Sequence, residues 1–282
     1  MRPRDGMSAA PAPAASQELP YADARGATRV NWIGLWTIIR REWSRLMRVP
    51  VQAFVAPWIS ATLFIFIFGF VVGRRISHIG GHRYIEFVLP GILMMNIVNA
   101  AFLQSSSQVY FSRFLRYIEE ALVAPLSYAE MIAGVIAVVV VRSVITALGI
   151  LVIATAFGAT AFHSLPQFLF WIAAVAMVFG LLGIVIGLWA NNFEQLNILN
   201  VFIITPLSFV GGMFNTVAML PDWLRWLAYA NPIFYFINGL RQAMIGYTDA
   251  NEFIGIGVAV GLAIVMSFAV WRLYATGYGL RE

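Results

Sequence analysis

Few residues of this 282-residue chain have side chains that could do chemistry, and their types exclude several kinds of site. The chain contains no cysteine, which excludes disulfides, thiolate metal sites and cysteine nucleophiles. It also contains no lysine, because all 18 basic residues are arginine. A Walker A phosphate loop and a Schiff-base enzyme both need a lysine. The sequence therefore predicts no ATP site and no enzyme activity of its own, so if ATP is used, another chain must bind it.

Two histidines, His78 and His82, come nearest to a metal site. A spacing of four residues would bring them together on a helix, but Gly80 and Gly81 lie between them and oppose a helix. The chain has no HExxH motif, and no serine is accompanied by a histidine and an acid in a catalytic arrangement. We expect no metal, no cofactor and no catalytic residue in this chain.

The elements that position the few polar and charged side chains are predicted to be apolar helices. Apolar residues make up 61% of the chain, charged residues only 11%, and the mean hydropathy is +0.80. Soluble domains have about 25% charged residues, and a helix needs about 20 apolar residues to cross a bilayer. The sequence predicts an all-α polytopic membrane protein with six transmembrane helices. The predicted spans are Val51–Gly73, Tyr84–Val109, Tyr128–Phe157, Pro166–Ala190, Leu196–Phe214 and Glu252–Tyr274.

The chain before the first span divides into two parts. Residues 1–30 are rich in Ala and Pro without a regular period and are predicted to be a disordered tail. Residues 31–49 form an amphipathic helix that we expect at the membrane interface, although packing on the body of the protein is the alternative. Residues 50–282 are the six-helix transmembrane domain. The apolar face of the amphipathic helix carries Trp32, Leu35, Trp36, Ile39, Trp43, Leu46 and Met47, and the opposite face carries Gly34, Arg41, Ser44, Arg45 and Arg48.

The distribution of arginine predicts the orientation in the membrane. If both termini are cytoplasmic, twelve arginines lie inside and five lie outside, namely Arg74, Arg75, Arg83, Arg225 and Arg241. Positive charge accumulates on the cytoplasmic side, so the count favours this orientation. Arg74 and Arg75, directly after the first span, argue against it because they would lie outside. The +5 net charge fits loops near anionic lipid better than nucleic acid.

The loop at residues 110–127 is itself amphipathic. Its apolar stripe consists of Phe111, Phe114, Leu115, Ile118 and Leu122, and its polar face carries Arg113, Arg116, Tyr117 and Glu120. A short helix of this kind is typical of a plug that fits a groove on another protein, and equally of a loop helix held against the bilayer. Both interpretations remain open at this point.

The segment between the fifth and sixth spans is too apolar for a water-exposed loop and too interrupted for a single span. Two short pieces meet at Asn231-Pro232, where the proline disfavours helix before it. We expect a re-entrant helical hairpin on the outer face, either beside a translocation path or as a structural lid. Its marker residues are Pro221, Trp223, Asn231, Pro232 and Arg241.

Polar residues inside the spans are the remaining candidates. Arg142, near the middle of the third span, either marks a functional site or reaches back to the interface, and in both cases it should face protein or water. The amides and hydroxyls could line a path between subunits or bond neighbouring helices. They are Asn96, Asn99, Gln104, Asn197, Asn200, Thr205 and Ser208. The acidic residues lie near span ends, which argues against a proton-driven carrier.

Three stretches together resemble the permease subunits of ABC-2 type transporters, in the YadH-like branch that is similar to nodulation-factor and drug export permeases. They are residues 114–125 (FLRYIEEALVAP), residues 205–214 (TPLSFVGGMF), and Leu220-Pro221 through Asn231-Pro232 to Gly239-Leu240-Arg241. The similarity extends from about Asn31 to Arg281.

The resemblance implies a six-helix permease that dimerises and docks one ABC ATPase subunit per half. In that family the amphipathic helix and the first cytoplasmic loop contact the ATPase, which binds ATP and Mg. The implied ATPase-coupling residues here are Arg113, Phe114, Arg116, Glu119, Glu120, Leu122 and Pro125, with Arg40, Arg41 and Arg45. This favours the plug over the lipid-bound loop.

The leading hypothesis is the permease subunit of an ATP-driven exporter in the bacterial inner membrane, acting as a homodimer in contact with lipid and not with nucleic acid. Phe, Met and Asn side chains along the path suit an amphipathic or lipid-like cargo, such as a drug, lipid or glycolipid. The predicted path residues are Asn96, Asn99, Arg142, Asn197, Asn200 and Thr205. An ATPase-independent scaffold or channel is the main alternative, and an ion-coupled carrier comes after it.

Overall fold

The computed structural model describes residues 31–75, 78–116, 126–159 and 162–279. The predicted disordered tail lies outside these residues. Six helices are long and apolar enough to cross a membrane, which confirms the predicted fold class. The first span consists of η2 (Val51–Val55), α2 (Ala56–Phe66) and η3 (Ile67–Val72). The second, third and fourth spans are α3 (Tyr84–Phe114), α5 (Tyr128–Ala156) and α6 (Leu165–Trp189). The fifth span consists of α7 (Phe193–Leu199), η4 (Asn200–Ile204) and α8 (Thr205–Val210), and the sixth is α11 (Glu252–Thr276).

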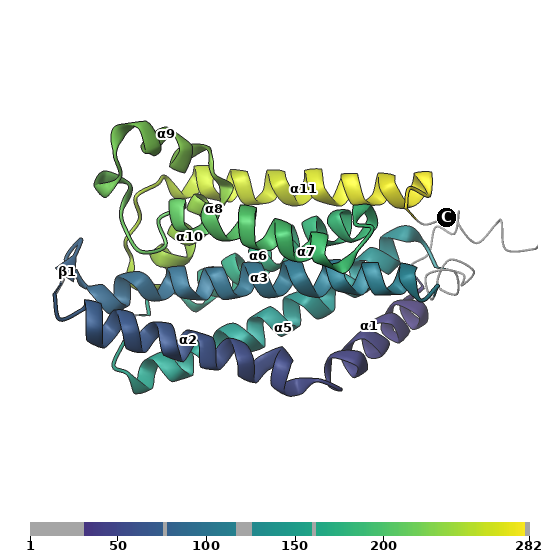
Figure 1. Ribbon diagram of the computed structural model, residues 1–282, viewed down its shortest axis with the longest axis horizontal. Coiled ribbons are helices and arrows are strands. Elements are labelled where there is room, and N and C mark those ends of the chain that lie inside the picture. The colour runs from purple at the N-terminus through teal and green to yellow at the C-terminus, as the bar shows by residue number, and fades with distance from the viewer. Residues whose placement is uncertain (1–30, 76–77, 117–125, 160–161, 280–282) are drawn as a thin grey trace, which may run out of the picture.

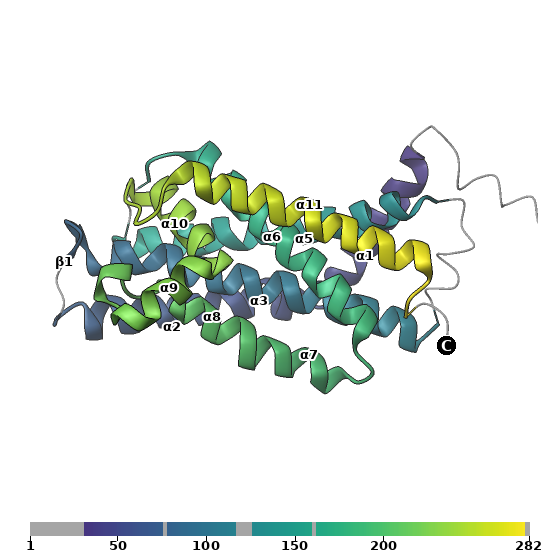
Figure 2. The same ribbon diagram turned by 90° about the horizontal axis from the view of Figure 1, so that it is seen from above.

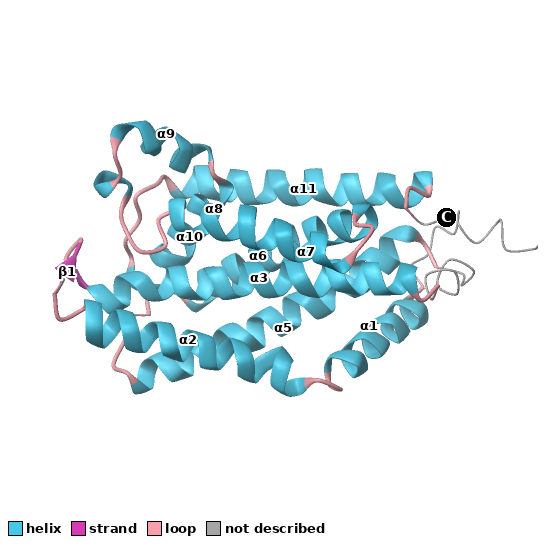
Figure 3. Ribbon diagram, viewed as in Figure 1, coloured by secondary structure: helices cyan, strands magenta, loops and turns pink. Residues whose placement is uncertain are grey.

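The remaining elements lie at the two ends of the bundle (Figures 1 and 3). Helix α1 (Trp32–Leu46) lies at the end where α11 finishes, which we call the α1 end. The opposite end, the α9 end, holds strands β1 (His78–Ile79) and β2 (His82–Arg83), the short helix η5 (Val217–Met219), α9 (Asp222–Ala230) and α10 (Pro232–Ile245).

Helices α3 and α6 form the centre of the bundle. The most apolar window of α3 is 67% buried and that of α6 is 56% buried, against 11% to 17% for the first, fifth and sixth spans. Gly183 and Gly187 allow the close approach, since a Cβ there would lie 2.5 Å from the Phe102 oxygen and 2.6 Å from the Ser106 oxygen. In Figure 2, α7 and α8 lie along one edge of the bundle. The outer spans are thus left for lipid or another chain.

Two spans widen into π-helix just before a proline. Segment η2 ends two residues before Pro57, and η4 ends two residues before Pro206. Proline has no N–H and its ring crowds the carbonyl four residues earlier, so the wider π turn relieves the contact. The first and fifth spans are therefore the irregular ones.

The histidine pair belongs to a hairpin and not to a helix. Strands β1 and β2 are antiparallel, and Ile79 pairs with His82. Gly80 and Gly81 form the turn with φ of 59° and 85°, a conformation that suits glycine. No group of three metal-binding side chains occurs in the described part of the chain.

Helix α1 packs on α5 and leaves two of its three tryptophans exposed, while Trp43 is half-buried. Ile38 and Glu42 are buried, whereas Trp32 and Trp36 are 73% and 64% exposed. The helix therefore combines both sequence alternatives: one face packs on the body of the protein, and the tryptophan face is unpacked. Its position at the membrane interface stays a prediction.

Candidate functional site

Helix α3 continues further at the α1 end than the sequence indicated. Residues Tyr110–Phe114, assigned above to a separate loop helix, are the last residues of α3. A 31-residue helix is about 46 Å long, whereas the hydrocarbon core is about 30 Å thick. The polar residues after Val109 suggested an end at the membrane, but a helix can pass beyond the bilayer without a break. Helix α3 is thus longer than a bilayer crossing needs, and we call its last residues, Tyr110–Phe114, the platform.

An aromatic patch covers this platform, consisting of Tyr110, Phe111, Phe114 and Phe193. The rings of Tyr110 and Phe114 stack with centroids 6.1 Å apart, and Phe111 lies 5.5 Å from Phe193 of α7. Phe114 is 70% exposed, and Phe111 and Phe193 are also exposed. Aromatic side chains gathered at an exposed end of a helix are typical of an interaction surface.

Arg113 connects α3 to α6. Its Nη1 donates to the backbone oxygens of Gly187, Leu188 and Ala190, at 3.1, 2.7 and 3.2 Å. These carbonyls end α6 and have no helical donor of their own, so a cation there is favourable. The sequence predicted Arg113 as a coupling residue but not this role within the chain.

The other loop candidates are only partly described. Arg116 follows the end of α3 with φ 59°, a left-handed conformation that glycine adopts more readily. Glu119, Glu120, Leu122 and Pro125 lie outside the described residues.

The arginines of α1 surround a buried acid. Arg41 and Arg45 contact Glu42 at 3.2 and 3.1 Å, and the Glu42 side chain is 6% exposed while theirs are 56% and 45% exposed. Arg40 is exposed. Because the arginines are largely in solvent, the pairs add little stability, and their positive charge remains available at the surface.

Arg142 joins three spans. Its Nε and Nη2 donate to the Ala53 oxygen at 3.2 and 3.1 Å, and its Nη1 donates to Gln104 Oε1 at 2.8 Å and to the Ala100 oxygen at 3.4 Å. Ala53 is the third residue of the first span, so the guanidinium lies near the α1-end boundary of that span. The structure thus answers the open question of what Arg142 faces: backbone and amide oxygens of the protein.

Of the predicted path residues, Asn96 and Asn99 stand on α3, Asn197, Asn200 and Thr205 stand on the fifth span, which packs against α3, and Arg142 stands on α5. Asn96 bonds within its own helix to the Ile92 oxygen at 2.9 Å, and Thr205 does so to the Asn200 oxygen at 3.0 Å. The buried Oδ1 atoms of Asn99 and Asn200 have no hydrogen-bond partner among the described residues.

Asn197 differs from these because its side chain is exposed. Its exposed neighbours include Ile198, Val201 and Phe202. An amide is poorly accommodated by lipid, so this face is suited to protein or water.

At the α9 end, the predicted break at Asn231-Pro232 is present, and α9 and α10 are the two short pieces. The Asn231 amide donates to the Leu207 oxygen at 2.6 Å, and its Oδ1 accepts from the Ile233 N–H at 3.0 Å. The side chain therefore ties the start of α10 to α8. Trp223 and Trp226 on α9 are 69% and 67% exposed.

Arg241, counted above among the outer arginines, is fully buried. Its Nη2 donates to the Gly212 oxygen at 2.7 Å, its Nε to the Phe87 oxygen at 3.4 Å, and its guanidinium lies 3.9 Å from the centre of the Phe87 ring. The residue holds α10 to α3 and to the turn after α8. Its sequence position at the end of a short apolar piece gave no sign of this.

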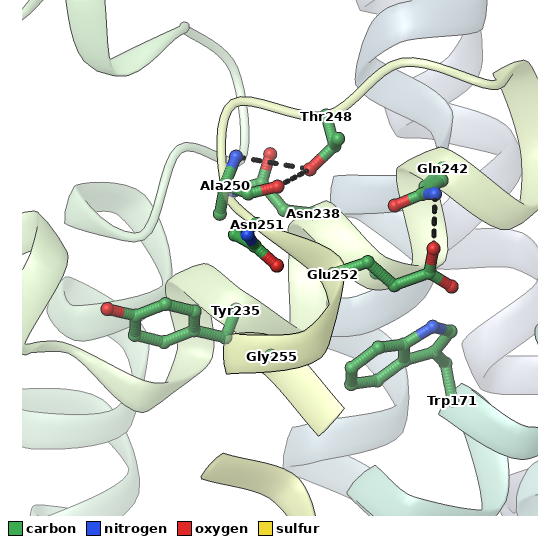
Figure 4. A pocket seen from close by; sticks show the side chains of 10 residues that line it. Trp171, Tyr235, Asn238, Gln242, Thr248, Ala250, Asn251, Glu252 and Gly255 are labelled. Carbon is green, nitrogen blue, oxygen red and sulfur yellow. Dashed lines mark hydrogen bonds between the residues drawn. The ribbon is translucent and has the colours of Figure 1, made fainter. Parts of the chain in front are cut away.

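A small pocket lined by polar side chains, with a cavity volume of about 10 Å³, lies beside α10 at the start of α11 (Figure 4). Glu252 accepts hydrogen bonds from Gln167 at 3.0 Å and from Gln242 at 2.7 Å, above Trp171. A cavity of this volume holds about one water molecule, so it is too small for a lipid-like cargo.

Near this pocket, Tyr247 donates to Asp249 Oδ1 at 2.7 Å. Partial burial and this neighbour raise the pKa of Tyr247 to about 12, so it remains a hydroxyl donor at neutral pH.

Comparison with known proteins gives consistent matches over most of the chain. The profile described as "ABC-2 type transporter" matches residues 34–245. The chain is 33% identical to the inner membrane transport permease YadH of Escherichia coli strain K12 over 251 residues, 89% of this chain and 98% of YadH. It is 23% identical over 258 residues to nodulation protein J of Sinorhizobium fredii (90% and 94%), and 25% identical over 243 residues to nodulation protein J of Rhizobium leguminosarum bv. trifolii (85% and 90%).

Proposed function

Because the chain belongs to the ABC-2 type transporter family, we propose that it is the permease subunit of an ATP-driven exporter whose energy comes from a separate ATPase chain. Family membership makes it the membrane component of an ABC transporter and a multi-pass inner membrane protein. Such permeases are not themselves ATPases, and a chain without lysine cannot form a Walker A loop.

The observation that carries this proposal is the aromatic patch at the end of α3. It lies at the end of a helix that is longer than a bilayer crossing needs, it is exposed, and it directly precedes the loop that resembles the family's coupling segment. The exposed Arg40, Arg41 and Arg45 lie at the same end of the bundle. An apolar anchor with cationic surroundings suits a groove in an ATPase that has an acidic rim.

The charges at the α1 end also bear on the orientation in the membrane, and we propose that both termini are cytoplasmic. Of the five arginines expected outside, Arg241 is buried and Arg225 is paired with Asp222 at 2.8 Å. The α1 end carries the exposed arginines of α1 and is therefore proposed as the cytoplasmic end.

A homodimer is proposed through the outer spans. The fifth span is only 17% buried, yet it exposes Asn197. A second copy on this face would cover the apolar side chains and give the Asn197 amide a polar environment, either directly or along a water-filled path. A path lined by Asn, Phe and Met suits an amphipathic or lipid-like cargo.

The test is co-purification of the chain with the ATPase encoded by the neighbouring gene. Phe114→Asp and Glu120→Arg should both abolish co-purification, because Phe114 is an exposed ring of the aromatic patch and Glu120 is on the polar face that the sequence predicts for the loop. Trp223→Asp is the matched control: Trp223 is also an exposed aromatic, at 69%, but lies on α9 at the opposite end of the bundle. If wild type never retains an ATPase, or both coupling variants retain it fully, the exporter proposal fails and an ATPase-independent scaffold or channel is favoured.

A further inference from the structure

Glu130 is the residue where two helices of the α1 end meet. It stands in the first turn of α5, three residues after the helix cap Ser127. One carboxylate oxygen, Oε2, accepts from the Ser127 N–H at 2.8 Å. The other, Oε1, accepts from the Asn31 N–H at 2.5 Å, where α1 begins. A single carboxylate thus caps the start of α5 and the start of α1, 99 residues apart in sequence.

The surroundings make this a continuous joint between the helices. Ser127 Oγ accepts from the Glu130 N–H at 3.2 Å, and Asn31 Oδ1 accepts from the Gly34 N–H at 2.9 Å. Both helix N-termini carry partial positive charge, and one carboxylate neutralises both. Leu126, the first described residue after the coupling loop, packs against Gly34. The end of the loop, the start of α5 and the start of α1 therefore contact one another directly.

The segment that follows α1 is held by the same helix. The chain leaves α1, passes Pro50 and enters the first span, where Arg142 of α5 holds the Ala53 oxygen. Between these points, α1 packs on α5 through Ile38 against Gly134. The start and the middle of α1 and the beginning of the first span thus all contact α5, which follows directly after the coupling loop.

We propose that Glu130 is a positioning residue that makes α1 and α5 move as one body, so that displacement of the coupling loop reaches the first span through α1. This inference rests on the proposed coupling to an ATPase. Rigid-body rocking needs contiguous packed elements, and the carboxylate is the polar contact that joins α1 to the helix nearest the loop. Without it, the start of α1 is held to α5 by side-chain packing alone, so displacement of α5 still reaches the first span through Arg142 but is no longer carried by α1.

The variants follow from the geometry. Glu130→Gln has one carbonyl oxygen and can accept from only one of the two N–H groups with the same geometry. The matched control is Glu86→Gln, since Glu86 occupies the same position in a capping box at the start of α3. Both of its oxygens accept from Arg83, the Nε at 2.8 Å and the backbone N–H at 3.3 Å, so Glu86 joins no second helix.

A disulfide between α1 and α5 can replace the lost hydrogen bond. Because the chain contains no other cysteine, two introduced cysteines within it can pair only with each other. A Cβ built on Gly134 lies 3.1 Å from the Ile38 Cβ, slightly under the 3.5–4.5 Å usual in disulfides. The atom that would clash most with it, Ile38 Cγ2, is removed in Ile38→Cys. The pair Ile38→Cys with Gly134→Cys therefore links the middle of α1 to α5.

The experiment measures ATP hydrolysis by the full complex in nanodiscs, with co-purification of the ATPase as a separate readout. Glu130→Gln should keep the ATPase bound and leave the KM for ATP unchanged, while kcat falls about tenfold, the size expected for a lost cap. Glu86→Gln should stay near the wild-type kcat. In the Glu130→Gln background, oxidising the cysteine pair should restore kcat, and reducing it should remove the gain.

Hydrogen exchange on the permease alone tests the joint without the ATPase. Amides in the first turn of α1 should exchange about tenfold faster in Glu130→Gln than in Glu86→Gln. The proposal is overturned if exchange there does not change, if kcat is unaffected, if Glu86→Gln loses as much, or if a formed disulfide restores nothing. If exchange changes as expected but wild type never binds an ATPase, the failure belongs to the proposed function, and the transmission role falls with it.

Discussion

Arg142 on α5 donates two hydrogen bonds to the backbone oxygen of Ala53 in the first span, at 3.2 and 3.1 Å. In a regular helix that oxygen would accept from the residue four positions later, which here is Pro57 and has no N–H. The arginine thus supplies donors where the proline removes one. A membrane arginine is costly unless its donors are satisfied, and this one also reaches an oxygen of Gln104.

The first prediction is that Arg142 and Pro57 are energetically coupled. Arg142→Met should lower the free energy of unfolding by about 2 kcal/mol, since it leaves buried oxygens without donors. In a Pro57→Ala background the same change should cost about 1 kcal/mol less, because residue 57 regains an N–H for Ala53. A double-mutant cycle with denaturation in mixed micelles measures the coupling, and a value of zero would contradict this account of Arg142.

The second prediction concerns the contact between α3 and α6. Gly183→Ala should lower the unfolding free energy by about 1–3 kcal/mol, because the new Cβ would lie 2.5 Å from the backbone oxygen of Phe102. Gly257→Ala is the control, since a Cβ there meets nothing within 4 Å, and it should be neutral or slightly stabilising. Thermal unfolding in one detergent compares them, and equal effects would mean that α3 and α6 are not packed this closely.

Much of the fold follows from the sequence because bilayer thickness and apolar runs impose it. All six spans are present, and their largest shift is at Val109, where α3 continues to Phe114. The break at Asn231-Pro232 was also predictable, since proline stops a helix whatever surrounds it.

What the sequence missed are contacts between distant segments. Nothing near Glu130 indicated that it would also cap α1, and nothing near Arg241 indicated that it would bond to Gly212. Capping-box spacing from Ser127 predicts only the local half of the role of Glu130. Pro57 is the sequence feature that could have indicated the contact made by Arg142. A proline in an apolar helix leaves the backbone oxygen four residues earlier without an N–H donor.

A third prediction tests Arg241 as the anchor of the α9 end. Val217 in η5 is 4% exposed, so a cysteine there should react slowly with a membrane-impermeant maleimide. Arg241→Lys removes the fork that reaches both Gly212 and Phe87, and should speed this reaction about tenfold by local opening. Ala218→Cys, at a neighbouring exposed position, should react rapidly in both backgrounds. If Val217→Cys stays protected, Arg241 does not hold this region.

A fourth prediction addresses the energetics of the aromatic patch. Phe114→Ala should weaken ATPase binding about tenfold or more, because an exposed aromatic that becomes buried at an interface is a typical anchor. Phe193→Ala removes a ring in the same patch and should have a smaller effect, since Phe193 is 41% exposed against 70% for Phe114. Titration of the purified ATPase onto permease in nanodiscs gives both affinities. The reverse order would place the contact on α7 instead of α3.

The measurement that tests the central claim most directly is ATP hydrolysis by the ATPase with and without this permease in nanodiscs. Coupling predicts that hydrolysis rises when wild-type permease is present and that Glu120→Arg removes the increase while the six-helix bundle remains folded. If the permease binds but leaves hydrolysis unchanged, or if Glu120→Arg stimulates as well as wild type, the coupling of this chain to an ATPase through residues 110–127 is contradicted.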